Sequence, residues 1–332
     1  MNDLKPAPHG WLILDKPRGL GSTQAVGMVK RVLRQGGYAK TKVGHGGTLD
    51  PLAEGVLPIA LGEATKLAGR MLDADKIYAF TIQFGEETAT LDTEGEVTER
   101  SDRRPPMAAI AGVLDHFTGP IEQVPPAYSA LKIDGKRAYD RARAGETVEM
   151  KTRAVTVHSL ELAGGREDAE VRSAFATTAG RPDPYDPQAP LELADSVTLV
   201  ARVSKGTYIR SLARDIARAL GTLGHVTYLR RIKAGPFLEE QAISLDKLEE
   251  IAKGAAIENL LLPLEAGLDD IPVLTLDPDS AQAVRQGRVL SELPHTDGLH
   301  LATAHDVPVA LMELDGGTAK VVRGFNLPDV AE

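Results

Sequence analysis

Residues Lys42 to Pro58 read KVGHGGTLDPLAEGVLP, where three glycines within four positions precede a single aspartate, Asp50, and a proline. An Asp-Pro pair is a common helix start, with the aspartate as N-cap and the proline at the first helical position. Glycine N–H groups also bind phosphate, but no Walker Lys-Ser/Thr follows, and Leu49 occupies the third glycine position of the dinucleotide fingerprint. A third interpretation pairs Asp50 with Glu54, four residues later, as the two carboxylates of a glycosidase.

The bulk composition is typical of a globular protein with one large domain or two domains. The 332 residues are 42% hydrophobic and 26% charged. No apolar run approaches the roughly 20 residues that span a bilayer, and the N-terminus lacks the features of a signal peptide, which predicts a cytoplasmic protein without a membrane partner. The chain has no cysteine, which excludes disulfides, iron-sulfur clusters and thiolate catalysis. Its eight histidines show no ligand spacing, so we expect no metal site.

Acidic and basic residues are unevenly distributed. The net charge of −9, from 38 basic and 47 acidic residues, by itself argues against a polyanionic partner. Residues 16–49, however, hold seven basic residues and no acidic one, and residues 202–233 hold eight basic residues against Asp215. Residues 239–280 hold eleven acidic residues against two lysines. If the two basic segments meet in the fold, they form a surface suited to nucleic acid, although each alone is equally typical of a solvated helix face.

Periodicity along the chain indicates strands interspersed with helices. Short or alternating apolar runs predict strands at 10–14, 77–84, 153–162 and 196–203. Helical spacing of apolar residues predicts one helix that Ser22 caps and another over 207–220. Because strands and helices do not alternate regularly, we expect an α+β fold with a mixed, largely antiparallel central sheet and flanking helices.

Two further features bear on domain organisation. Residues 164–190 carry four prolines and little periodicity, which predicts a long surface loop. A domain boundary is expected near residues 265–272. Beyond it, predicted strands at 299–303, 309–314 and 319–322 indicate a small β-rich module.

Seven motifs are more specific together than any one of them. They are LDKPRG (14–19), VGHGGTLDPLAEGVLPIALGEATK (43–66), DKIYAF (75–80), TLDTEG (90–95), PPAYSALKIDGKRAY (125–139), SKGTYIRSLARDI (204–216) and HVTYLRR (225–231). In this order and spacing, the chain resembles the bacterial tRNA pseudouridine-55 synthases of the TruB type nearly end to end. The family often has His-Thr-Gly where this chain has His-Gly-Gly at 45–47, and the segment 164–190 looks longer than usual. Neither departure removes a residue considered below.

The resemblance implies a fold, a reaction and a partner. It implies a pseudouridine synthase catalytic domain over residues 1–268, with a basic insertion at about 124–153, and a PUA-like RNA-binding domain over 269–332. The reaction would convert uridine-55 in the T-loop of tRNA to pseudouridine, without a cofactor, in a monomer that binds the T stem-loop. One alternative is a non-catalytic tRNA-binding or tRNA-folding protein that uses the same cleft. A hydrolase with paired carboxylates is a third reading.

The resemblance assigns catalysis to three residues. Asp50 would be the essential aspartate, acting as a nucleophile at C6 or C1′ or as a base at the 2′ position, which the sequence does not distinguish. Arg210, in KGTYIR, would keep that carboxylate ionised, because a nearby cation lowers a carboxyl pKa. Tyr78, in DKIYAF, would stack on the flipped uracil and help to remove the C5 proton. By pattern alone, Tyr78 is typical of a core strand position and Arg210 of a helix surface.

Five more residues are assigned to substrate binding by the resemblance. Tyr208 and Leu229 would line the uracil pocket, and His45 would lie near the flipped nucleotide. Asp92, in TLDTEG, would belong to the Arg210 network, and Lys16, in LDKPRG, would contact the substrate. Without the resemblance, Leu229 is typical of the core, His45 of a loop and Asp92 of an acidic turn.

Overall fold

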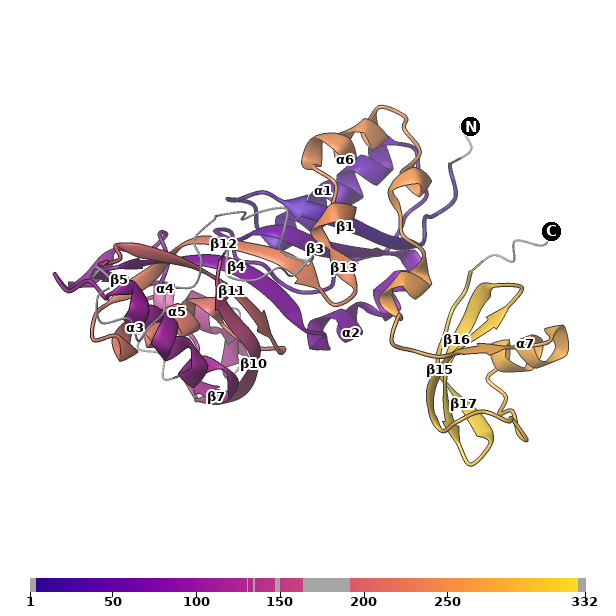
Figure 1. Cartoon of the computed structure of the whole chain (residues 1–332). Coiled ribbons are helices and arrows are strands. Elements are labelled where there is room, and N and C mark those ends of the chain that lie inside the picture. The colour runs from indigo at the N-terminus through magenta and orange to yellow at the C-terminus, as the bar shows by residue number, and fades with distance from the viewer. Residues whose placement is uncertain (1–3, 130, 134, 147–149, 164–191, 328–332) are drawn as a thin grey trace.

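The computed structural model describes residues 4–129, 131–133, 135–146, 150–163 and 192–327 (Figure 1). Its main feature is a nine-stranded sheet with the order β1-β3-β12-β4-β11-β10-β7, to which β2 adds beside β3 and β13 beside β12. These strands are β1 (Gly10–Lys16), β2 (Val43–His45), β3 (Glu54–Leu61), β4 (Lys76–Phe84), β7 (Gly119–Gln123), β10 (Arg153–Leu162), β11 (Ser196–Val203), β12 (Gly224–Ala234) and β13 (Phe237–Leu238). Among the described strands of this sheet, only β3 and β12 pair in parallel. The predicted α+β fold and its four strands are confirmed.

Helices pack around this sheet at two places (Figure 1). α1 lies beside α6 near β1, and α5 packs against β12 and β4 farther along the sheet. The helices are α1 (Ser22–Gln35), α2 (Ala68–Asp73), α3 (Met107–Val113), α4 (Ala138–Arg143), α5 (Ile209–Ala219), α6 (Leu245–Ala252) and α7 (Pro278–Arg285), with the 3₁₀ helices η1 (Gly62–Lys66), η2 (Leu114–Phe117), η3 (Glu239–Gln241), η4 (Ile257–Leu260) and η5 (Leu264–Gly267). Apolar residues of α1, α5, α6 and the sheet form one hydrophobic core. Two short hairpins, β5 (Glu86–Thr88) with β6 (Val97–Arg100) and β8 (Lys132–Ile133) with β9 (Lys136–Arg137), complete this part.

The start of α1 differs from the prediction. Its N-cap is Gly21, whose N–H donates to the Gln24 side chain at 2.8 Å, and Ser22 is already the first helical residue. The prediction that Ser22 caps the helix is therefore wrong. Its buried hydroxyl instead contacts the loop that contains Asp50, so a tertiary contact replaces the local one.

The second predicted helix is confirmed as α5, two residues shorter at its start than expected. It begins after Tyr208, whose backbone N–H donates to the side-chain oxygen of Gln123 at 3.1 Å. The Gln123 amide nitrogen donates in turn to the Tyr208 carbonyl at 3.4 Å. Because Gln123 is almost fully buried at the end of β7, it fixes where α5 starts.

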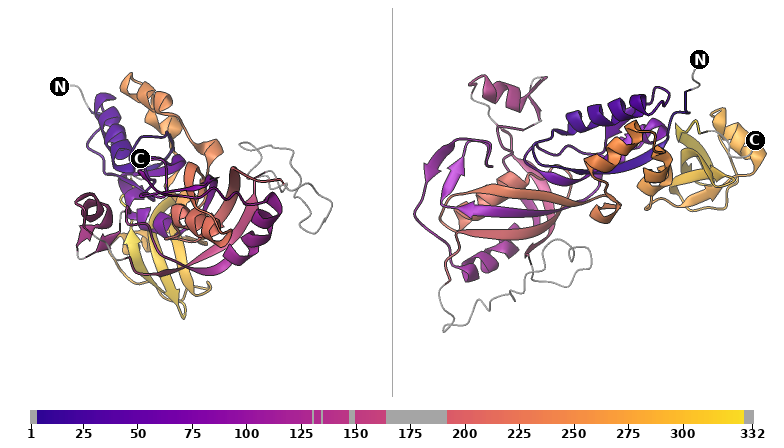
Figure 2. Two further views of the ribbon diagram at one scale, coloured as in Figure 1. Left: turned by 90° about the vertical axis from the view of Figure 1, so that its left-hand side faces the viewer. Right: turned by 90° about the horizontal axis from the view of Figure 1, so that it is seen from above.

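A second sheet follows η5, with the order β14 (Val273–Thr275), β15 (Gly298–Ala304), β16 (Val307–Asp315) and β17 (Thr318–Gly324). The three strands predicted here are confirmed. The sheet lies at the end of the molecule away from β7 and β10, with α7 beside it (Figures 1 and 2). Leu301, Leu311 and Phe325 share a hydrophobic cluster with Trp11 and Leu264, so this sheet packs against the larger part through apolar contacts.

The predicted surface loop over 164–190 lies outside the described residues. Within the described ranges, no helix is long and apolar enough to span a bilayer.

Candidate active site

Asp50 lies in the loop between β2 and β3, and no helix begins there. The reading of Asp50 as a helix N-cap is therefore wrong. Glu54 is the first residue of β3, so the helical pairing of Asp50 with Glu54 is wrong as well. Residues 55–61 of β3 pair with β1, and this tertiary pairing overrides the local Asp-Pro signal. Asp50 remains partly exposed, with 36% of its side chain accessible.

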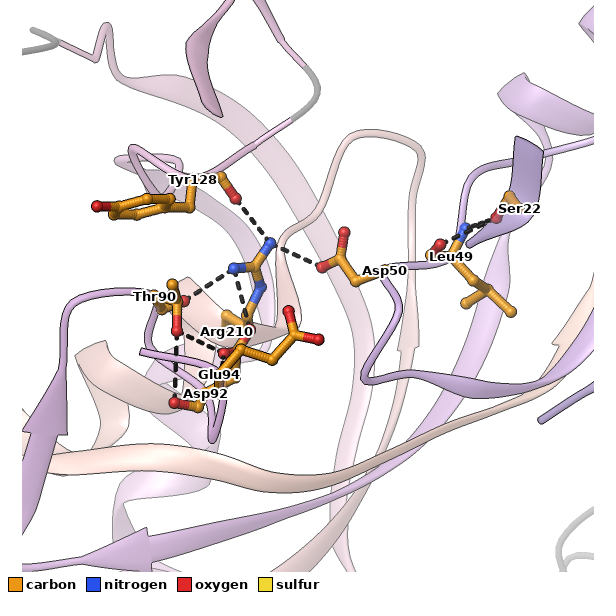
Figure 3. Close-up of polar contacts among 8 residues, drawn as sticks. All are labelled: Ser22, Leu49, Asp50, Thr90, Asp92, Glu94, Tyr128 and Arg210. Carbon is orange, nitrogen blue, oxygen red and sulfur yellow. Dashed lines mark hydrogen bonds and ion pairs between the residues drawn. The ribbon is translucent and has the colours of Figure 1, made fainter. Parts of the chain in front are cut away.

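Contacts on both sides of Asp50 hold this loop in place. The Ser22 hydroxyl donates to the Leu49 carbonyl at 2.9 Å and accepts from the Leu49 N–H at 2.8 Å (Figure 3). After Asp50, the Pro51 carbonyl accepts from the Gly19 N–H at 2.7 Å. Because the residues on either side of Asp50 are fixed, the backbone that carries its carboxylate has little freedom.

Lys16 contacts the same loop from inside the protein. Its side chain is fully buried, and the ammonium donates to the carbonyls of Pro17 at 3.0 Å, Leu20 at 2.7 Å and Pro51 at 3.4 Å. Burial lowers the pKa of Lys16 to about 8. With three carbonyls around the ammonium, the structure gives Lys16 a place inside the protein and not the substrate contact that was expected.

Arg210 lies between Asp50 on one side and the turn with Thr90 and Asp92 on the other (Figure 3). Its Nη2 is 2.7 Å from Asp50 Oδ2, and its Nη1 is 3.2 Å from Asp92 Oδ2. The guanidinium also donates to the carbonyls of Thr90 at 2.8 Å and Tyr128 at 3.0 Å. Only 5% of the Arg210 side chain and 1% of the Asp92 side chain are exposed. Asp92 therefore anchors the arginine from inside, and the arginine orients Asp50 at the surface.

The carboxylate of Asp92 is itself held by its own turn. Its Oδ1 accepts from the Thr90 hydroxyl and from the Glu94 N–H, the latter at 2.9 Å. The pKa of Glu94 is raised, first by burial and then by the nearby negative charges of Asp92 and Asp50. The turn thus adds the carboxyl groups of Asp92 and Glu94 to the site, on the inner side of the partly exposed carboxylate of Asp50.

A pocket of about 210 Å³ opens beside Asp50 and Arg210. Tyr78 from β4, Leu229 from β12 and Tyr208 at the start of α5 line it. The lining runs from Gly47 to Arg231, so residues up to 184 positions apart in the chain meet here. Burial raises the pKa of Tyr208, which keeps its phenol neutral. A carboxylate beside two aromatic rings in a small pocket suits a flat ring bound next to a nucleophile or a base.

His45 lies outside the lining of this pocket, at the end of β2. It is half-buried, and its Nδ1 atom has no hydrogen-bond partner among the residues that the structure describes. Burial, with a smaller effect from the Arg231 charge, lowers the pKa of its imidazole, which favours the neutral ring. Within the same described ranges, no three His, Asp or Glu side chains gather as a metal site requires.

Sequence reasoning assigned no site role to Lys76 or Arg231, which both line the pocket. They occur in the quoted motifs DKIYAF and HVTYLRR, but spacing cannot show that β4 and β12 are neighbours. Arg231 is also buried, and Arg230 pairs with Asp15 at 3.1 Å and Glu239 at 3.0 Å. Some basic residues of 202–233 are thus internal, so not all of them are available to the surface that the two basic segments would form if they meet.

Comparison with known proteins agrees with this architecture. Residues 31–181 match the family described as "TruB family pseudouridylate synthase (N terminal domain)", and residues 210–269 match the "tRNA pseudouridylate synthase B C-terminal domain". The tRNA pseudouridine synthase B of Novosphingobium aromaticivorans is 62% identical over 97% of this chain and 99% of its own length. The protein of the same name from Zymomonas mobilis is 55% identical over the same shares.

Solved structures show the same fold. An H/ACA ribonucleoprotein bound to a substrate RNA containing 2′-deoxyuridine has a chain with a TM-score of 0.66 and 25% identity, covering 97% of this chain and 86% of that chain. A Cbf5-Nop10-Gar1 complex gives a TM-score of 0.65 and 26% identity, over 98% of this chain and 91% of that chain. From the family match and the close relatives, this chain belongs to the TruB family of pseudouridylate synthases.

Proposed function

We propose that this chain converts uridine-55 in the T-loop of tRNA to pseudouridine, with Asp50 as the essential catalytic residue. Its close relatives are named tRNA pseudouridine synthase B, which supports uridine isomerisation in tRNA as the activity. The single observation that carries the proposal is the contact of the Asp50 carboxylate with Arg210, 2.7 Å apart, at a pocket lined by two tyrosines.

Each residue of the site has a role that its position supports. The target uridine leaves the T-loop and enters the pocket, where Tyr78 stacks on the base and Tyr208 and Leu229 enclose it. Asp50, oriented by Arg210, acts on the sugar or on the base. The bond between N1 and C1′ breaks, the uracil turns, and C5 bonds to C1′. The C5 proton is released and N1 takes up a proton, so the composition of the nucleoside is unchanged and the reaction needs no second substrate.

The parts outside the pocket would hold the rest of the RNA. Residues 1–268 form the catalytic domain in this proposal, and the basic insertion at about 124–153 closes on the stem-loop. Residues 269–332, which include the second sheet, act as a PUA-like RNA-binding domain. Lysine and arginine contacts to phosphate predict that the affinity for tRNA falls as salt rises. The enzyme would act as a monomer, with His45 beside the flipped nucleotide.

The test compares Asp50→Asn with Asp73→Asn. Asp73 is a surface aspartate paired with Lys205, and its variant controls for the loss of a carboxylate. With tRNA tritiated at uracil C5, we expect Asp50→Asn to release no tritium while it binds tRNA with nearly unchanged affinity. Asp73→Asn should release tritium and bind tRNA as the wild type does. Tritium release by Asp50→Asn at the wild-type rate would refute the assignment.

Two other outcomes would identify the competing functions. A wild-type protein that binds tRNA without releasing tritium would be a tRNA-binding or tRNA-folding protein. Free uracil in the reaction would indicate a hydrolase, because an isomerase leaves the mass of the RNA unchanged. Chemical mapping of pseudouridine in the product tRNA tests position 55 directly.

A further inference from the structure

Two buried cations line the pocket, and neither forms an ion pair with a carboxylate of the described residues. Lys76 is 7% exposed and Arg231 is 1% exposed, and both belong to the pocket lining. Among the described residues, no carboxylate oxygen lies within 4.0 Å of the nitrogens of either side chain. Buried charges in proteins are normally paired, so two unpaired cations in one pocket indicate a site for negative charge.

Backbone carbonyls fix both side chains. The Lys76 ammonium donates to the carbonyls of Met71 at 2.9 Å, Leu72 at 2.8 Å and Ala74 at 2.6 Å. Arg231 donates through Nε to Val56 at 2.7 Å and through Nη2 to Gly47 at 3.2 Å. These contacts hold the positive charges in place but do not neutralise them.

The charge of Arg231 is felt by its neighbours. It contributes, after burial, to the lowered pKa of Lys76, which is about 8, and of His45. At neutral pH Lys76 therefore still carries its proton. The Asp50 loop approaches Arg231 closely at Gly47, where φ is +135° and an added Cβ would lie 3.4 Å from the Arg231 Nη1 atom.

The strand register places both cations beside Tyr78. Arg231 lies directly opposite Tyr78 in the pairing of β12 with β4, and Lys76 precedes Tyr78 by two residues on the same strand. Opposite residues, and residues two apart on one strand, point to the same face of a sheet. The two basic side chains therefore lie on the same face of the sheet as the ring that stacks on the base in the proposed function, whereas Asp50 supplies the only carboxylate of the described pocket lining.

We infer that Lys76 and Arg231 stabilise the negative charge of the uracil ring while it is detached from the ribose. This inference rests on the proposed isomerisation. When the bond between N1 and C1′ breaks, its electron pair stays on N1 and the charge spreads to O2 and O4. The ring turns, C5 attacks C1′, the C5 proton passes to water or a base, and N1 takes up a proton. Fixed charges beside the ring also keep the anion from leaving.

A phosphate is the competing ligand for two cations. Both side chains are buried, and the three N–H groups of Lys76 are directed at carbonyls, so neither can wrap around a phosphate as exposed lysines and arginines do. The charge that they can act on is one that develops inside the pocket. This favours the base over the RNA backbone.

The experiment uses the full chain and two tRNAs, one with uridine and one with 5-fluorouridine at the target position. The matched variants are Arg231→Gln with Arg231→Lys, and Lys76→Met with Lys76→Arg, which differ in charge at one position. Single-turnover loss of the target nucleoside is followed by nuclease digestion and chromatography. Fluorine withdraws electrons from the ring and makes it a better leaving group, so it substitutes for a lost cation.

We expect the charge-removing variants to react with uridine about 10²-fold more slowly. Their ratio of 5-fluorouridine to uridine rates should exceed the wild-type ratio at least about 10-fold, since the lost stabilisation then depends on the ring itself. The charge-keeping variants should stay closer to wild type in this ratio. If one position fails to fold without its charge, the pair at the other position decides.

An unchanged ratio in folded charge-removing variants would overturn the inference. Weaker tRNA binding with a salt dependence reduced by about one ion, and an unchanged single-turnover rate, would identify a phosphate contact instead. Failure of the wild type to form pseudouridine would refute the proposed function. A normal wild type with an unchanged fluorine ratio in the variants would refute only the role of the two cations.

Discussion

The two ion pairs of Arg210 differ in burial, and this predicts that the arginine stabilises the fold mainly through Asp92. Asp92 is 1% exposed and Asp50 is 36% exposed. Replacing Arg210 with methionine leaves the Asp92 carboxylate buried without a cation, which costs about 3–5 kcal/mol. The partly exposed pair with Asp50 should contribute less than about 1 kcal/mol. Two carbonyls, of Thr90 and Tyr128, also lose their donor.

The sign of a double substitution separates these contributions. Arg210→Met/Asp92→Asn removes the buried charge that Arg210→Met leaves behind, so the double variant should be more stable than Arg210→Met alone. We expect a coupling free energy of about 2 kcal/mol between Arg210 and Asp92, and of less than about 1 kcal/mol between Arg210 and Asp50. Urea unfolding followed by circular dichroism, with Asp50→Asn in the second cycle, measures both. Additive losses for Arg210 and Asp92, or equal couplings, would refute this reasoning.

Two other predictions concern the residues that hold the Asp50 loop. Ser22→Ala removes both hydrogen bonds to Leu49 and should cost about 1–3 kcal/mol of stability. In this variant kcat should fall while KM stays nearly unchanged. The control, Ser280→Ala at the exposed start of α7, should leave kcat at the wild-type value. For Lys16, the pKa is about 8 in the fold and 10.5 in the unfolded chain, so between these values the unfolded state binds more protons. The free energy of unfolding of the wild type, relative to that of Lys16→Met, should therefore rise from pH 8 to pH 10.5 by at most about 3 kcal/mol, as measured by urea titrations. A difference that stays constant over this pH range would mean that folding does not lower the pKa of Lys16.

The sequence predicted most of the secondary structure and little of the side-chain environment. Alternation was enough for β10 and β11, whose observed bounds equal the predicted ones. The cap of α1 was wrong because the Ser22 hydroxyl contacts Leu49, a residue 27 positions away, and local rules do not include such contacts. The contact between Asp50 and Arg210 was expected from the resemblance to a family, because the spacing of the two residues in the sequence gives no sign of it.

Buried charges were the least predictable feature. From the sequence alone, three basic residues are expected at the surface, because lysine and arginine are seldom buried: Lys16, Lys76 and Arg231. Each is buried here because the strand that carries it has neighbours on both sides or backbone carbonyls around its end. The strand neighbours of Lys76 and Arg231 lie more than 100 residues away in the chain and leave no periodic signal. The Pro51 carbonyl reaches Lys16 only through the tertiary structure. The burial of these three positions could therefore be recognised only from the fold.

The parallel pairing of β12 with β3 has a consequence for synthesis of the chain. β12 ends at residue 234 and is inserted between β3 and β4, both of which precede residue 85. During translation the first strands must wait, with one edge open on each side of the gap, until the ribosome has released more than two thirds of the polypeptide. Nascent chains of this protein should therefore be favourable clients for chaperones that cover exposed strand edges.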